Sequence, residues 1–175
     1  TAEARPRRAP PPPRASVLNV ISHPAIERVR AHAKQHGLDV EIRRYPAGTH
    51  TAQDAARAIG CEVGQIVKSL VFLAAGDPVV VLVSGSDRVD EGKLRAALGA
   101  PVRRATATEV RERPGYVVGG VPPCGHGPTT RAIVDRGLLA REVVWAAAGL
   151  PDAVFPIAPE DLVRIGGARV VEVAV

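Results

Sequence analysis

Two apolar segments in the first half of the chain constrain its fold most. Residues 66–74 (IVKSLVFLA) and 78–83 (PVVVLV) have the length and β-branched content of strands, and Gly76-Asp77 between them is typical of a tight turn. Both faces of the first segment are largely apolar, so we expect a hairpin that is buried on both sides.

Further strands and short helices alternate along the rest of the chain. Capping residues and glycine stops predict helices from His23-Pro24 to Gly37, at 52–59, from Asp90 to Leu98, from Thr106 to the residue before Pro114, and at 159–163. Apolar patterning predicts strands at 40–45, 130–134, 142–147, 154–157 and 169–175. This irregular spacing does not suit a doubly wound fold and favours a mixed sheet with helices packed on it.

The N-terminus differs from the rest of the chain in composition. Residues 1–16 contain five prolines, four of them in the run Pro10–Pro13, and carry a net charge of +3. We therefore expect a flexible Pro/Arg-rich tail at 1–16 and a single domain at 17–175. Because the whole chain carries +5, the remaining residues carry only +2, which is too little for a dense nucleic-acid-binding stripe.

Several classes of protein do not fit the sequence. No apolar run approaches the ~18–20 residues of a membrane span, and the N-terminus has no signal-peptide core. The two cysteines, Cys61 and Cys124, form no CxxC motif and no disulfide framework. We expect a soluble cytoplasmic protein that binds no membrane, metal or cofactor.

Lys68 is the most unusual residue of the predicted hairpin. It shares a strand face with Ile66, Leu70 and Phe72, where an unpaired ammonium group would cost several kcal/mol to bury. One interpretation is a side chain that extends to water at the end of the strand. The other is a fixed cation in a functional site.

A second unusual segment is the loop Gly115–Gly127, which has five glycines and two prolines in 13 residues. Such a backbone could hold a carbonyl or an oxyanion through N–H groups, or it could be an ordinary tight connection. Cys124 and His126 lie in this loop. The other histidines show no metal-ligand spacing, and a Cys–His pair this close in sequence is seldom aligned for proton transfer, so we favour neither a metal site nor a thiol nucleophile.

Short motifs follow one another in a fixed order over residues 24–172. They are Thr51-Ala52-x-Asp54-Ala55-Ala56, Ile59-Gly60-Cys61, Gln65-Ile66-Val67-Lys68-Ser69-Leu70-Val71-Phe72, Gly85-x-Asp87-Arg88-x-Asp90, Lys93-Leu94, Gly115-Tyr116, Gly119-Gly120-Val121-x-Pro123-x-Gly125-His126, Asp135, Leu138, Ala148-Gly149 and Pro159-x-Asp161-Leu162. In series they strongly resemble the YbaK/ProX family of aminoacyl-tRNA deacylases, the free-standing relatives of the editing domain inserted in bacterial prolyl-tRNA synthetases.

The resemblance implies a fold and a set of site residues. The fold is α+β, a mixed, mostly antiparallel, barrel-like sheet with short helices around it. Lys68 matches the essential family lysine, and Gly119 and Pro123 match a GxxxP motif whose glycine backbone holds the aminoacyl group and places a water. The implied catalytic residues are Lys68 and Gly119, and the implied substrate-binding residues are Gly120, Val121, Pro123, His126, Asp135, Thr51 and Ser69. Pro122 and Cys124 depart from the residues common in the family.

The resemblance also implies a function. By this resemblance the protein is expected to be a trans-acting deacylase that needs no metal and no cofactor. It would hydrolyse the ester of a mischarged tRNA, such as tRNA(Pro) carrying alanine or cysteine. Its partners are the aminoacyl-tRNA 3′ end and an aminoacyl-tRNA synthetase. Two alternatives stay open: a non-catalytic tRNA- or synthetase-binding module of the same fold, and a thiol hydrolase that uses Cys124.

Overall fold

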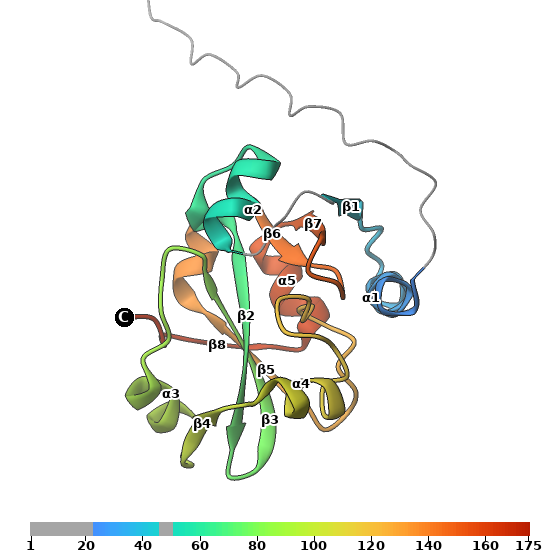
Figure 1. Ribbon diagram of the computed structural model, residues 1–175. Coiled ribbons are helices and arrows are strands. Elements are labelled where there is room, and N and C mark those ends of the chain that lie inside the picture. The colour runs from blue at the N-terminus through green and yellow to red at the C-terminus, as the bar shows by residue number, and fades with distance from the viewer. Residues whose placement is uncertain (1–22, 46–50) are drawn as a thin grey trace, which may run out of the picture.

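The computed structural model describes residues 23–45 and 51–175 and contains two β-sheets with helices around them (Figure 1). The α-helices are α1 (Pro24–Gln35), α2 (Ala52–Ile59), α3 (Glu91–Leu98), α4 (Ala107–Glu112) and α5 (Pro159–Gly166), and two 3₁₀ helices are η1 (Val63–Gln65) and η2 (Arg136–Ala140). The strands are β1 (Arg43–Arg44), β2 (Val67–Ala74), β3 (Asp77–Ser84), β4 (Val102–Arg104), β5 (Arg131–Asp135), β6 (Val144–Ala147), β7 (Ala153–Ile157) and β8 (Arg169–Val171).

The predicted hairpin forms the centre of the larger sheet. The sheet has the order β4-β2-β3-β5-β8, in which β2 pairs antiparallel with β3 and β4, while β3, β5 and β8 run parallel. Every residue of β3 after Asp77 is buried, as the continuous apolar run predicts. The short strand β4 was not predicted, because its sequence Val-Arg-Arg carries no apolar alternation.

The smaller sheet has the order β1-β7-β6 and is antiparallel throughout. A parallel bridge between Ile66 and Trp145 connects it to the start of β2. The predicted α+β fold with mostly antiparallel strands is thus confirmed. Its strands form two open sheets rather than a closed barrel, because β4 and β8 each have one strand neighbour among the described residues.

The helix starts follow the predicted capping residues. Thr51 Oγ1 accepts a hydrogen bond from Asp54 N–H (3.0 Å), and Thr106 and Glu109 form a reciprocal capping box at α4. Asp90 caps α3 in the same way through the Lys93 N–H. Two predicted strands are shorter than expected: 40–45 is reduced to β1 and 169–175 to β8.

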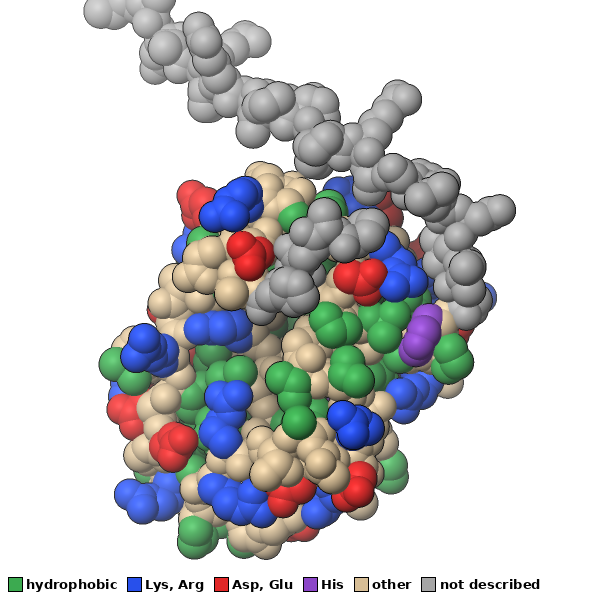
Figure 2. Space-filling model, in the orientation of Figure 1, with side chains coloured by type: hydrophobic (Ala, Val, Ile, Leu, Met, Phe, Trp, Pro, Cys, Tyr) green, Lys and Arg blue, Asp and Glu red, His purple; other side chains and the backbone are tan. Residues whose placement is uncertain are grey.

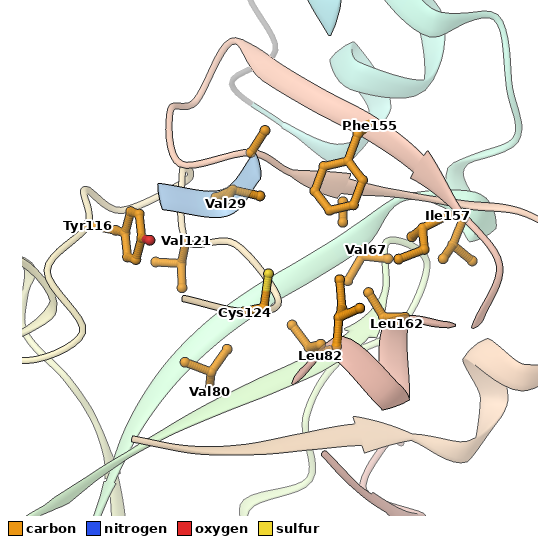
Figure 3. Close-up of a cluster of buried hydrophobic side chains, with 14 of the residues drawn as sticks. Val29, Val67, Val80, Leu82, Tyr116, Val121, Cys124, Phe155, Ile157 and Leu162 are labelled. Atoms are coloured by element: carbon orange, nitrogen blue, oxygen red, sulfur yellow. The ribbon is translucent and has the colours of Figure 1, made fainter. Parts of the chain in front are cut away.

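Two apolar cores cover the faces of the larger sheet. The larger core contains Val67, Val71, Val80 and Leu82 from β2 and β3, with residues of α1, α5, β6 and β7 packed over them (Figure 3). The smaller core, on the other face, contains Phe72, Val79 and Val81 beneath Leu94 of α3.

The predicted tail at 1–16 lies outside the described residues. None of the helices within 23–45 and 51–175 has the length and apolarity needed to cross a bilayer. On the face shown in Figure 2, basic side chains are interspersed with acidic ones and do not form a continuous stripe.

Candidate active site

A pocket of about 310 Å³ lies where the two sheets diverge. Ile66, just before β2, bridges Trp145 of β6, and the described residues of the two strands form no further ladder with each other. Helix α2, the loop around Gly119 and the junction of β4 with α4 enclose the gap. Its lining residues are Thr51, Ala52, Ala55, Ile66, Val67, Lys68, Ser69, Leu70, Val71, Arg104, Ala105, Val110, Val118, Gly119, Val121, Trp145, Ala147, Pro151 and Val154.

One wall of the pocket is the backbone edge of β2. The Gly85 N–H donates to the Ile66 carbonyl on the β3 side of the strand, whereas the Ala105 N–H donates to the Val71 carbonyl on the opposite side. Because successive residues of a strand alternate in direction, the N–H and C=O of Ser69 also point away from β3. Strand β4 pairs only with Phe72–Ala74, so Ser69 presents both backbone groups to the pocket.

The Ser69 hydroxyl is unusual among the described side chains. Its Oγ is the one buried side-chain nitrogen or oxygen there that has no hydrogen-bond partner. Leaving such a group unsatisfied costs about 1–3 kcal/mol. Ser69 lines the pocket but its Oγ has almost no accessible surface, so a ligand would recover that free energy once the side chain turns toward it.

Lys68 lies in the same wall, and a hydrogen bond fixes the position of its ammonium group. Its Nζ donates a hydrogen bond to the Asp87 carbonyl oxygen, in the segment after β3. Burial lowers the pKa of Lys68, the Asp87 carboxylate opposes this shift, and the nearby Arg88 guanidinium adds to it. The side chain is half-buried, so the structure combines the two interpretations of the sequence: the amine leaves the core and also lines the pocket.

The glycine-rich loop supplies a tight turn at the pocket. The Gly120 N–H bonds the Val117 carbonyl (3.0 Å), and Gly119 has φ = +85°, a value that favours glycine. Gly120 is buried, and a Cβ there would lie 2.9 Å from the backbone of Leu150. Gly119 and Val121 line the pocket, while Gly120 allows the turn to pack against the neighbouring loop.

Five of the nine predicted site residues thus surround one pocket. They are Lys68, Gly119, Thr51, Ser69 and Val121. Gly120, Pro123, His126 and Asp135 do not belong to its lining. Pro123 is buried beside α5, where its carbonyl would lie 2.7 Å from a Cβ at Gly166.

His126 is buried and stabilises the glycine-rich loop through contacts with other residues of that loop. Its Nε2 forms a hydrogen bond with the Pro122 carbonyl, and its ring packs edge-on against Tyr116. Burial lowers the pKa of His126 to about 4. The imidazole is therefore neutral near pH 7, and its geometry favours a structural role.

Asp135 holds the C-terminal segment rather than facing the pocket. One carboxylate oxygen accepts hydrogen bonds from the N–H groups of Val173 (2.8 Å) and Ala174 (3.0 Å), and the other accepts from Gly137 (2.9 Å). The side chain is only 2% exposed. These contacts favour a structural role for Asp135 as well.

Cys124 lies in the larger core beside Val121, Val80 and Leu82 (Figure 3). It is 1% exposed, and burial raises the pKa of its thiol to about 12. A thiol of this kind provides almost no thiolate near pH 7, so the geometry argues against the thiol-hydrolase alternative.

Among the lining residues that sequence reasoning did not predict as site residues, Trp145 and Arg104 have the side chains best suited to bind a ligand. Trp145 is the single tryptophan of the chain and lies on a four-residue strand whose residues alternate between buried and half-buried. The two-residue period of strand side chains would by itself have placed Trp145 and Ala147 on one face, but the sequence Val-Trp-Ala-Ala does not show that this face lines a pocket. Arg104 stacks over Phe72, with its guanidinium carbon 5.4 Å from the ring centroid.

The described residues include no group of three or more His, Cys, Asp or Glu side chains that could hold a metal ion. The polar groups of the pocket are instead an ammonium, hydroxyls, a guanidinium and backbone amides. Such a set can bind a phosphate, a carbonyl or a developing oxyanion.

One family model and several known proteins resemble this chain. Residues 46–165 match the model of the aminoacyl-tRNA editing domain. The chain is 28% identical over 147 residues to the uncharacterized protein YwhH of Bacillus subtilis, covering 83% of this chain and 94% of that protein. It is 33% identical over 112 residues to a proline–tRNA ligase of Limosilactobacillus fermentum, covering 60% of this chain but only 20% of the ligase.

A solved structure extends the likeness to the fold. A crystal structure of a proposed trans-editing enzyme for prolyl tRNA synthetase aligns with a TM-score of 0.82 at 43% identity. The alignment covers 88% of this chain and 99% of that one.

Proposed function

Because the chain belongs to the aminoacyl-tRNA editing domain family, we propose that it is a trans-acting deacylase that hydrolyses the ester of a mischarged tRNA. The substrate is tRNA(Pro) carrying a small wrong amino acid such as alanine or cysteine. The likeness to an editing enzyme for prolyl tRNA synthetase and to a proline–tRNA ligase supports this tRNA. The protein would act in the cytoplasm, where tRNA is charged, alone or beside a synthetase.

One observation carries the proposal. A single pocket brings together the Lys68 ammonium, the unpartnered Ser69 hydroxyl and the free backbone edge of β2. An aminoacyl ester is already activated, so its hydrolysis mainly requires a positioned water and stabilisation of the charge that develops on the carbonyl oxygen. These three groups suit that task.

The reaction is a water-mediated hydrolysis. Water attacks the ester carbonyl carbon, the carbonyl oxygen becomes an oxyanion, and the C–O bond to the ribose breaks as the ribose oxygen takes a proton. The Lys68 ammonium stabilises negative charge on the substrate, and the backbone of Gly119 fixes the aminoacyl group. No side chain of the protein forms a covalent bond to the substrate. The free amino acid and the tRNA 3′ end leave as products.

The size and lining of the pocket favour a small amino acid. Beyond Ser69 the wall contains the apolar side chains of Val71, Ala105, Val110 and Val121, and Arg104 beside them is a cation that does not favour a basic amino acid. Each additional methylene changes binding in such a pocket by only ~1–3 kcal/mol. We therefore expect the enzyme to accept more than one small side chain.

The test is hydrolysis of tRNA(Pro) charged separately with proline, alanine, cysteine, serine and threonine, with and without EDTA. We expect cleavage of one or two mischarged species, no cleavage of prolyl-tRNA and no effect of EDTA. Lys68→Ala should abolish turnover, whereas the matched control Lys34→Ala, at an exposed position on α1, should not.

Two outcomes would contradict the proposal. A folded Lys68→Ala protein with normal turnover would remove the proposed role of the ammonium. Tight tRNA binding without cleavage of any species would favour the non-catalytic binding module instead.

A further inference from the structure

We propose that Trp145 is the stacking platform for the terminal adenine of the tRNA. This inference rests on the proposed function, and it assigns the half of the pocket that the reaction itself does not use. The base of the terminal nucleotide would lie on the indole while its ribose reaches Lys68 and Ser69.

The strand geometry turns Trp145 toward the pocket. In β6, Val144 and Ala146 are fully buried in the larger core, whereas Trp145 and Ala147 are half-buried and line the pocket. The partner of Ala147 on β7 is Val154, which lines the pocket as well. A half-buried aromatic ring in a pocket wall offers a binding surface at a small cost in side-chain entropy.

The spacing along β2 fits a nucleoside. Trp145 lies opposite Ile66, with which it forms the bridge between the two sheets, and Lys68 follows Ile66 by two residues in β2. Two residues of strand span about 7 Å. This span is comparable with that from a purine ring to the 3′-oxygen of its own ribose, where the scissile ester is attached.

The opposite end of the pocket is suited to a different part of the substrate. Past Ser69, the wall formed by Val71, Ala105 and Val110 carries no aromatic ring. If the aminoacyl side chain occupies that end, the ester lies beside Lys68 and Ser69 in the middle, and the adenine lies at the end that contains Trp145.

One side of the indole already has a partner. The guanidinium carbon of Arg43 lies 5.2 Å from the ring centroid, and Arg43 is itself paired with Glu41 at 3.0 Å. The indole also packs against the buried cluster of Ala55, Ala56, Ile59, Ile66 and Val154, so a base would stack on the part of the ring that lines the pocket. Stacking needs only the π-face of a base, so this contact would serve every tRNA that ends in adenosine, whatever its amino acid.

The first experiment measures binding without hydrolysis. Trp145 is the only tryptophan of the chain, so its fluorescence reports directly on its surroundings. The probe is 3′-alanylamino-3′-deoxyadenosine, whose amide replaces the ester. We expect it to quench the tryptophan fluorescence of the full chain saturably, and we expect weaker binding of the same amide on a ribose without a base. An adenosine amide that leaves the fluorescence unchanged would overturn the inference.

The second experiment is a double-mutant cycle that combines Trp145→Leu with removal of the base from the amide. Binding is measured by calorimetry, and Trp145→Phe is the conservative control. Trp145→Leu keeps apolar bulk but removes the π-face, and it should raise the dissociation constant of the adenosine amide by about 5- to 150-fold. Trp145→Phe should retain most of the affinity. The base-free amide should bind Trp145→Leu and the wild type equally.

The results separate this inference from the proposed function. Equal affinity of Trp145→Leu and the wild type for the adenosine amide, or an equal loss for both amides, would refute the stacking role even if the protein hydrolyses mischarged tRNA. Conversely, the cycle could hold while no ester is cleaved, in which case the adenine site would stand and the proposed reaction would fail.

Discussion

Replacing Asp135 tests whether this carboxylate belongs to the structure or to the substrate site. Its two oxygens accept three backbone N–H groups, from Gly137, Val173 and Ala174, and the bond to Val173 is fully buried. Asp135→Ala would leave all three donors without their acceptor. Each unsatisfied buried donor costs about 1–3 kcal/mol, and water can reach the exposed Gly137 and, in part, the half-buried Ala174. We therefore expect a loss of about 3–5 kcal/mol in the free energy of unfolding.

Asp135→Asn gives a graded version of the same test. The amide oxygen can still accept from Val173 and Ala174, but the amide nitrogen would face the Gly137 N–H and one hydrogen bond would be lost. The expected loss is about 1–3 kcal/mol. The control is Asp161→Ala, whose partly exposed ion pair with Arg164 should contribute no more than about 1 kcal/mol.

The assay is urea unfolding together with hydrolysis by the folded fraction. Both Asp135 variants should shift the unfolding midpoint without changing the slope, and their folded molecules should keep the wild-type turnover. A stable Asp135→Ala protein with no activity would refute this reasoning and return Asp135 to the substrate site that the sequence predicted.

Two further predictions concern the glycine-rich loop. Because folding lowers the pKa of His126 from 6.5 to about 4, the imidazole is protonated in the unfolded chain at a higher pH than in the folded one. As the pH falls from 6.5 to 4, the wild type should therefore lose about 3 kcal/mol of unfolding free energy relative to His126→Gln. Urea unfolding over this range measures the difference, and parallel pH profiles for the two proteins would contradict the prediction. Gly120→Ala should lower the free energy of unfolding by about 1–3 kcal/mol, because the new Cβ would lie 2.9 Å from the Leu150 backbone. Gly119→Ala should lower it by about 1–2 kcal/mol for a different reason: its nearest neighbour is Pro151 at 3.8 Å, but its positive φ strains an alanine. Equal urea midpoints for Gly120→Ala and the wild type would refute the packing argument.

Local signals in the sequence were sufficient to predict most of the elements. The caps at Thr51, Asp90 and Thr106 act within one helical turn, and the apolar hairpin is joined by two residues, so each depends on neighbours in sequence. The division into two sheets depends on a contact between Ile66 and Trp145, which are far apart in the chain. No periodicity within either strand encodes that contact.

The candidate site divides in the same way. Lys68 was noticeable because an ammonium on an apolar strand conflicts with burial, and the positive φ at Gly119 is what a glycine-rich loop would predict. By contrast, the sequence gives no means of distinguishing Asp135 and His126 from pocket residues. A polar side chain that binds buried backbone and one that binds a ligand look the same in a sequence, and only their partners separate them.

Strand β2 explains how one element serves both stability and the pocket. Its even-numbered residues direct their backbone groups to β3 along the whole hairpin, while its odd-numbered residues bond β4 only in the second half. An unpaired strand edge normally invites pairing with another chain. Here the free edge at Ser69 forms a pocket wall, enclosed by α2 and the turn at Gly119. The hairpin holds the backbone donors of this edge in place before a substrate binds. Little reorganisation is therefore needed when negative charge develops on an ester oxygen.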